Sequence, residues 1–121
     1  MKAKITASVS AALVFIPLMS CISFADQQRD QVYNTSRNQL GLIKYCTENE
    51  HLPAEAVTAF QKMVAVLPVA SDKSLSDKYE AEGAQGNGYD GAQIVSIKDI
   101  ATAMGSDNDT YCSQYKSLIN Q

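Results

Sequence analysis

The chain has 121 residues, with ten Lys and Arg against thirteen Asp and Glu, a single His, three Cys and no Trp. This length supports one small domain. A formal net charge of −3 argues against a dedicated nucleic-acid binder, which needs a basic face. One His also excludes a multi-His metal site within one chain. We therefore expect no nucleic acid, metal or cofactor.

The first 25 residues have the plan of a cleaved secretory signal peptide. Lys2 and Lys4 give a positive start, an uncharged and largely apolar stretch follows, and Ser23-Phe24-Ala25 places small residues before the polar segment from Asp26. A membrane anchor is the alternative, but Pro17 interrupts the segment and its apolar core is shorter than the roughly 20 residues of a span. The sequence therefore predicts a mature chain over residues 26–121, periplasmic or secreted.

A competing processing site lies slightly earlier. Leu18-Met19-Ser20-Cys21 resembles a bacterial lipobox, in which Cys21 is lipidated and becomes the new N-terminus. Met is uncommon at its position, so the soluble form is favoured. Membrane contact is expected only if Cys21 is lipidated or if the protein is itself membrane-active.

Removal of the leader changes the charge and the cysteine count. Two lysines are lost, which leaves eight bases against thirteen acids and a net charge of −5. Cys46 and Cys112 remain, and an even count in an exported chain predicts a disulfide between them. Closing a loop of that length stabilises a small domain by about 4 kcal/mol. Two free thiols or an intermolecular bridge are the alternatives.

Two amphipathic segments open the mature chain. Apolar residues recur at spacings of three and four from about residue 30 to 49, which predicts a helix. That stripe comprises Val32, Ser36, Leu40, Ile43 and Cys46. Gly41 within it weakens the helix and marks a close approach of another helix. A second helix is predicted between Pro53 and Pro68, and the short connection favours an antiparallel hairpin.

The second half of the chain is predicted from its caps and glycines. Ser74 begins a capping-box variant and a short charged helix over about 75–82. Four glycines in residues 83–91 predict a flexible loop, and residues 92–95 can form a strand but have no evident partner. Ser96 and Ser106 begin two final helices, with Gly105 as a left-handed C-cap between them. The expected fold is an all-α bundle of four or five helices with one disulfide.

The start of these final helices resembles the helix-turn-helix of DNA-binding proteins over about twenty residues. Ala101, Gly105 and Tyr111 match its small residue, its turn and its buried position. The resemblance implies a second helix lying in the major groove. Residues 106–119 carry two Asp and one Lys, however, and an acidic helix does not hold phosphates. DNA binding is therefore disfavoured, and a helical corner is expected.

Candidate functional residues are few. No paired catalytic groups emerge, so we expect that the chain is not an enzyme. His51, which follows the first helix beside two glutamates, is interpreted as a solvated helix end. Tyr is common at protein interfaces, and the candidate partner contacts are Tyr33, Tyr79 and Tyr89. Tyr45 and Tyr111 each adjoin a disulfide cysteine and are expected to pack around it.

These features predict an exported helical protein that acts without catalysis through protein contacts. In size, export and cysteine count the chain is similar in outline to small periplasmic one-disulfide proteins such as acid-stress chaperones. An inhibitor or immunity protein for a secreted toxin has the same features. The alternative is a membrane-active or pore-forming secreted protein, although no mature segment is long enough to span a bilayer as an apolar helix.

Overall fold

The computed structural model describes residues 17–119, with side chains from residue 25 onward. Most of the predicted signal peptide, residues 1–16, lies outside the described residues, as does the side chain of Cys21. The predicted cleavage site after Ala25 falls within the first helix. Cleavage and lipidation stay predictions.

The described chain is mostly helical, as expected, with one small sheet. The helices are α1 (Pro17–Glu48), α2 (Glu55–Ala65), α3 (Lys73–Ala84), α4 (Ile97–Ala103) and α5 (Asn108–Ser113), and a 3₁₀ helix, η1 (Gln114–Leu118), follows α5. Strands β1 (Asn87–Tyr89) and β2 (Ile94–Ser96) form an antiparallel hairpin between α3 and α4.

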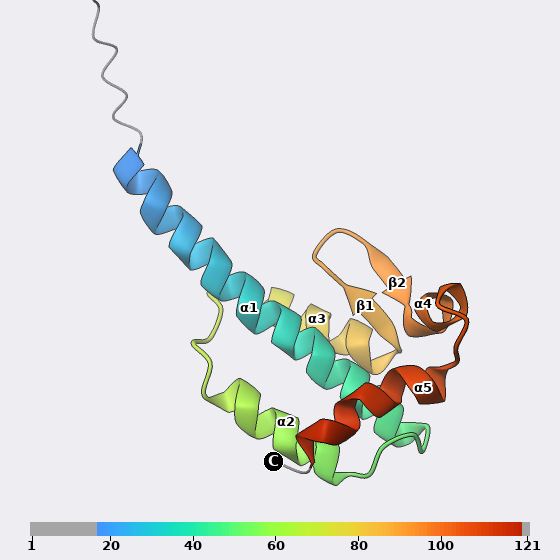
Figure 1. Ribbon diagram of the computed structural model, residues 1–121. Helices are drawn as coiled ribbons and strands as arrows, with labels where there is room; N and C mark the ends of the chain where they lie inside the picture. The colour runs from blue at the N-terminus through green and yellow to red at the C-terminus, as the bar shows by residue number, and fades with distance from the viewer. Residues whose placement is uncertain (1–16, 120–121) are drawn as a thin grey trace, which may run out of the picture.

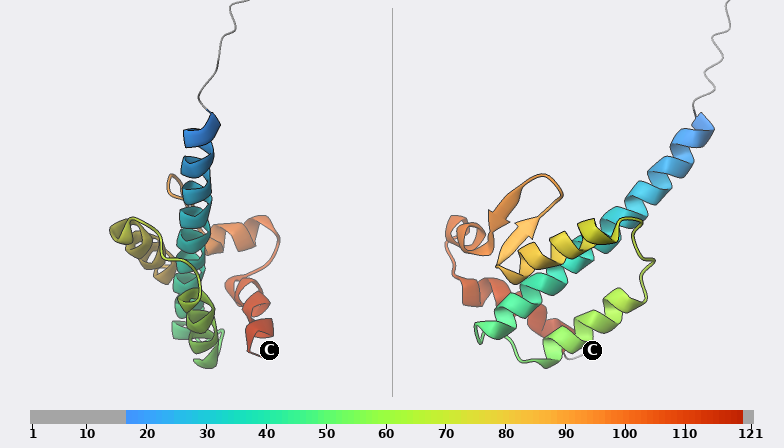
Figure 2. Two further views of the ribbon diagram at one scale, coloured as in Figure 1. Left: turned by 90° about the vertical axis from the view of Figure 1, so that its left-hand side faces the viewer. Right: turned by 180° about the vertical axis from the view of Figure 1, so that it is seen from behind.

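The long helix α1 is the axis on which the other elements pack (Figure 1). From its far end α2 returns in the opposite direction, which is the antiparallel hairpin that the short connection predicts (Figure 1). In contrast, α3 runs alongside α1 in the same direction, and Figure 2 shows this pair from behind. The hairpin, α4, α5 and η1 then complete the domain around the second half of α1, while the N-terminal part of α1 projects beyond it.

The hydrophobic core lies mainly between α1, α2 and α5. Its buried members are Tyr33, Leu40, Leu42, Ile43, Cys46, Leu52, Ala56, Phe60, Val64, Ala70, Ile97 and Cys112. The predicted disulfide is present: Cys46 and Cys112 are fully buried, bonded at 1.99 Å, and separated by 66 residues of sequence. It joins the last turn of α1 to α5 within this core.

The α1–α3 crossing is unusually close, as the glycine in the first helix predicts. A Cβ atom added to Gly41 would lie 2.1 Å from the Glu80 carbonyl oxygen, and one added to Gly83 would lie 2.1 Å from the Asn38 carbonyl oxygen. Only glycine on both helices allows the two backbones to approach so far. The flexible loop predicted from residue 83 is therefore wrong at its start, because Gly83 is a buried residue of α3.

The rest of residues 83–91 also differs from the prediction. Residues 87–89 form β1, which supplies the partner that the isolated strand at 92–95 lacked. The predicted stripe of the first helix holds in its second half, but Val32 is 55% exposed and Ser36 is half-buried. In this first half of the predicted helix, Tyr33 and Asn34 are buried in place of Val32, because α3 packs against the face of α1 that carries them.

Two of the predicted helix ends are confirmed. The Ser96 hydroxyl accepts a hydrogen bond from the Asp99 amide and caps α4, and Gly105 after it has φ +72°. At α3 the cap is Asp72, whose carboxylate accepts from the Leu75 amide, so the predicted Ser74 is not the capping residue. The final helix is shorter than predicted, because α5 ends at Ser113 and tightens into η1.

Candidate functional site

An open groove of about 480 Å³ runs along one side of α1. We call it the α1 groove. Its lining residues are Thr35, Asn38, Gln39, Leu42, Phe60, Met63, Gly88, Tyr111, Gln114, Tyr115 and Leu118. They come from α1, α2, β1, α5 and η1, so that four helical segments and one strand of the hairpin frame one surface.

Helical spacing explains how α1 supplies one wall. Thr35, Gln39 and Leu42 lie four and three residues apart, and side chains at these spacings share one face of a helix. On α2, Phe60 and Met63 are three residues apart and face the same space. The turn from α5 into η1 completes the groove with two tyrosines and a leucine. Each wall is thus continuous with the hydrophobic core.

The groove is uncharged. Its lining combines apolar and aromatic side chains with amides and hydroxyls, and none of the lining residues is acidic or basic. Burial, together with the nearby Tyr111, raises the pKa of Tyr115 above its usual value. The Tyr115 hydroxyl therefore stays protonated at physiological pH. Such a lining suits a neutral and partly apolar surface of a protein partner, with amides and hydroxyls available for hydrogen bonds.

Asn38 connects this groove to α3 and the hairpin. Its side-chain amide donates to the carbonyl oxygens of Tyr79, at 2.9 Å, and Asn87, at 3.0 Å, and its side-chain oxygen accepts from the Tyr89 amide at 3.3 Å. All three partners are backbone groups, so Asn38 places β1 against α1. The position of Gly88 at the groove edge follows from these bonds.

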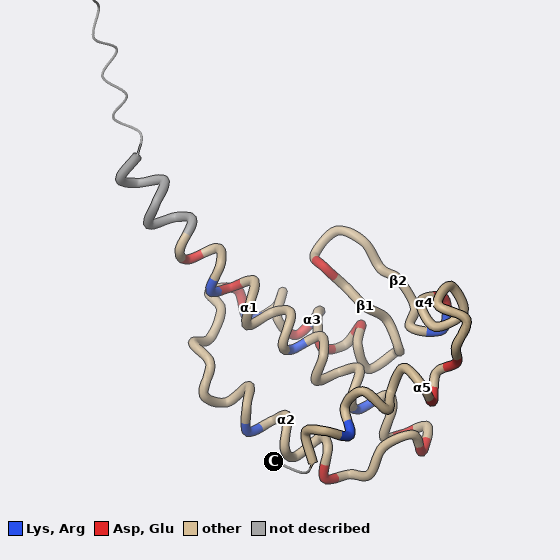
Figure 3. The backbone as a smooth tube through the Cα atoms, viewed as in Figure 1, with Lys and Arg blue, Asp and Glu red and all other residues tan. Residues whose placement is uncertain are grey.

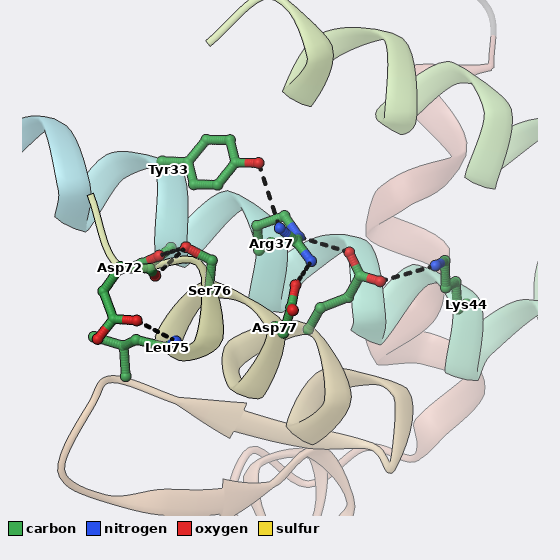
Figure 4. Close-up of polar contacts among 9 residues, drawn as sticks. Tyr33, Arg37, Lys44, Asp72, Leu75, Ser76 and Asp77 are labelled. Carbon is green, nitrogen blue, oxygen red and sulfur yellow. Dashed lines mark hydrogen bonds and ion pairs between the residues drawn. The ribbon is translucent and has the colours of Figure 1, made fainter. Parts of the chain in front are cut away.

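A cluster of charged side chains joins α1 to α3 on another side (Figure 4). The Arg37 guanidinium donates to Asp77 and Glu80, each at 2.8 Å, and to the Tyr33 hydroxyl at 3.3 Å. Lys44 pairs with the second oxygen of Glu80 at 3.0 Å. Burial opposes the charge of Glu80, but hydrogen bonds from Lys44 and Arg37 outweigh it and lower its pKa.

The predicted partner tyrosines are placed differently from one another. Tyr33 and Tyr79 are only 9% and 2% exposed, so both rings serve internal packing and present almost no surface to a partner. Tyr89 is half-buried and its ring packs at a tilt of 51° against that of Tyr79, with ring centroids 4.7 Å apart. Tyr111 and Tyr115 are the tyrosines that line the groove.

His51 pairs with a residue that the sequence did not indicate. Its Nδ1 lies 3.1 Å from the exposed Asp109 carboxylate of α5, and the His51 side chain is 24% exposed. Within residues 17–119 no group of three or more His, Cys, Asp or Glu side chains gathers closely enough to hold a metal ion. In the same part of the chain no helix combines the length and apolar character that crossing a membrane requires.

Comparison with known proteins gave no match to a family model, a curated protein or a solved structure. Function is therefore inferred from the residues of the site itself. The structure defines a small, mostly helical, disulfide-bonded domain with an uncharged groove along its longest helix. Sequence reasoning missed the groove because its walls come from five elements. It also missed Asn34 and Asn38, whose spacing of four on one helix face was the available signal.

Proposed function

We propose that this protein acts without catalysis, by holding another protein in the α1 groove. The observation that carries the proposal is the chemistry of the lining, which is apolar and aromatic at its base and neutral at its polar positions. Interfaces that bind proteins are enriched in Tyr, Phe and Met and depleted of charge at their centre. The groove has that composition.

The proposal includes export to the periplasm or the exterior. A buried disulfide persists where the surroundings are oxidising, and the N-terminal sequence has the plan of a signal peptide. In the periplasm or outside the cell, two roles suit the uncharged α1 groove. A stress chaperone holds many partly unfolded clients, whereas an inhibitor or immunity protein holds one toxin or enzyme.

Site-specific photo-crosslinking tests the proposal and separates these roles. A photoreactive amino acid replaces Gln39, which is exposed at the groove, in cells that express the full chain. The matched control replaces Gln61, which is exposed on α2 outside the groove. We expect protein adducts to form several-fold more strongly at position 39. Many adducts indicate a chaperone, and one dominant adduct indicates an inhibitor.

A second pair of variants shows whether the adducts depend on the groove. Gln114→Arg places a charge at the groove edge and should remove most adducts formed from position 39. Gln61→Arg should leave them unchanged. Equal crosslinking from positions 39 and 61 would overturn the proposal. If the purified protein instead releases dye from lipid vesicles, the membrane-active alternative replaces it.

A further inference from the structure

The domain consists of two parts that are held together by different forces. Helices α1, α2 and α5 share the apolar core and the disulfide. Helix α3 makes the most extensive contact with α1, yet its buried residues are Ser76, Tyr79 and Gly83, and none of them belongs to that core. The shared core therefore does not hold α3, whose contact with α1 consists of the close glycine crossing, the buried Tyr79, and hydrogen bonds and ion pairs.

Carboxylates supply much of that interface. Asp77 and Glu80 of α3 face Arg37, Lys44 and Tyr33 of α1 (Figure 4). Before α3, the Ser71 amide and hydroxyl bind the Asp30 carboxylate of α1. On the side of the hairpin, Lys78 lies over the Tyr89 ring. Figure 3 shows acidic and basic positions close together where α1 and α3 run side by side.

We propose that the α1–α3 interface is an acid-sensitive contact. When the pH falls and these carboxylates take up protons, α3 and the β1–β2 hairpin separate from α1, while α1, α2 and α5 stay joined by the core and by the Cys46–Cys112 disulfide. The separated segment stays tethered at both ends, through α2 and through α5.

The charges that remain after protonation favour separation. A neutral Glu80 no longer balances Arg37 and Lys44. Arg37 is only 15% exposed, so it would keep a charge that has lost one of its two carboxylate partners and has little hydration. The apolar core that α1, α2 and α5 share does not include the buried residues of α3.

The direction of the pH effect follows from the pKa shifts. Burial would raise the pKa of Glu80, but hydrogen bonds from Lys44 and Arg37 lower it below its usual 4.5. The pKa of Asp72, which caps α3, is lowered from 3.8 by the hydrogen bonds that its carboxylate accepts. A carboxylate with a lowered folded pKa stabilises the fold above its unfolded pKa. That contribution is lost as the pH falls through the folded pKa. The interface is therefore intact at neutral pH and weakens as the pH falls through the folded pKa of Glu80, which lies below the usual 4.5.

Separation would change the α1 groove, and this consequence rests on the proposed function. Asn38 holds the backbone of β1, which forms the edge of the groove at Gly88. Removal of α3 and the hairpin would widen the groove and expose Tyr79, whose ring is 2% exposed in the folded protein. Acid would then increase the apolar surface offered to a partner.

Residue-resolved NMR of the oxidised protein tests the acid-sensitive contact without reference to any partner. Amide spectra are recorded from pH 7 to pH 2.5. We expect the signals of residues 73–96 to lose their native positions at a higher pH than those of α2 and of Cys46. Simultaneous loss across all elements, or native signals for α3 at pH 2.5, would overturn the proposal.

Amide variants test the assignment to particular carboxylates. Asp77→Asn with Glu80→Gln imitates protonation, so α3 should be destabilised already at pH 7 and should lose most of its pH dependence. The matched control is Asp99→Asn with Glu55→Gln, at two exposed positions of α4 and α2. If the interface variant titrates like the control, other groups cause the transition and the proposal is wrong. Crosslinking from position 39 at pH 7 tests the proposed binding of a protein in the α1 groove, and its result does not depend on whether the α1–α3 contact is acid-sensitive.

Discussion

At the scale of single residues, the side of α1 that faces α3 is small and polar. Gly41 removes the side chain where the two backbones meet, and Asn34 and Asn38 satisfy buried polar groups around that point. Asn34 accepts a hydrogen bond from the buried Ser76 hydroxyl. These three residues replace the apolar stripe that most helix pairs use.

Substitution of Gly41 tests how strictly the crossing needs glycine. Gly41→Ala should destabilise the protein by about 3 kcal/mol, because overpacking a close backbone contact forces both helices to move. Urea unfolding followed by circular dichroism measures this change. Gly88→Ala is the control, since a Cβ atom there would meet the Val95 carbonyl oxygen at an ordinary 3.5 Å. Equal stability of the Gly41 variant and the wild type would contradict the close crossing.

The sequence indicates some of these residues and hides others. Gly41 stands out because glycine is costly inside a helix, so its presence suggests a packing role. Asn34 and Asn38 are marked only by their spacing of four, which is a weak signal because asparagine is mostly exposed in proteins. Their partners at Ser76, Tyr79 and Asn87 lie 41 to 49 residues away, which only the folded chain reveals.

At the scale of elements, local capping signals were more informative than composition. Ser96 and Gly105 were predicted from their neighbours alone, and both hold in the structure. The predicted caps at Ser74 and Ser106 locate the starts of α3 and α5 closely, but the capping residues are Asp72 and Asp107. The β-hairpin was not predicted in full, because β1 is the three-residue segment Asn-Gly-Tyr in a glycine-rich stretch. It forms where α1 supplies the Asn38 side chain to two of its backbone groups. A tertiary contact thus determines this element.

The cap of α4 gives a prediction at this scale. Ser96→Ala should lower the free energy of unfolding by about 1 kcal/mol, because the Asp99 amide loses its acceptor. Chemical denaturation of both proteins measures the difference. Ser117→Ala, in the exposed part of η1, should change the stability by less than about 0.5 kcal/mol. Similar values for the two variants would show that the cap is not stabilising.

At the scale of the whole molecule, the disulfide is the main covalent constraint within the described residues. It was predictable because only two cysteines follow the predicted cleavage site, whereas the groove depends on five elements and was not. Reduction should lower the free energy of unfolding by about 4 kcal/mol, since the unfolded chain regains the freedom of a long loop. Denaturant titrations with and without reductant measure this.

Accessibility of the two sulfur atoms provides the control for that measurement. Neither sulfur is a free thiol in the disulfide, so the oxidised protein should not react with an alkylating reagent even when it is unfolded, and its mass should be two hydrogens below that of the dithiol. After reduction in denaturant both sulfurs should react. Ready alkylation of the untreated native protein would show that the bridge is not formed.

The parallel direction of α1 and α3 affects how the chain acquires its shape over time. Partners across that interface are separated by 41 residues at Asp30 and Ser71, 42 at Asn34 and Ser76, and 43 at Arg37 and Glu80. Contacts that close loops of this length form slowly compared with those of a helical hairpin. During synthesis, α1 and α2 emerge first and can assemble. The polar side of α1 therefore stays exposed to water until α3 has been synthesised and can pack against it.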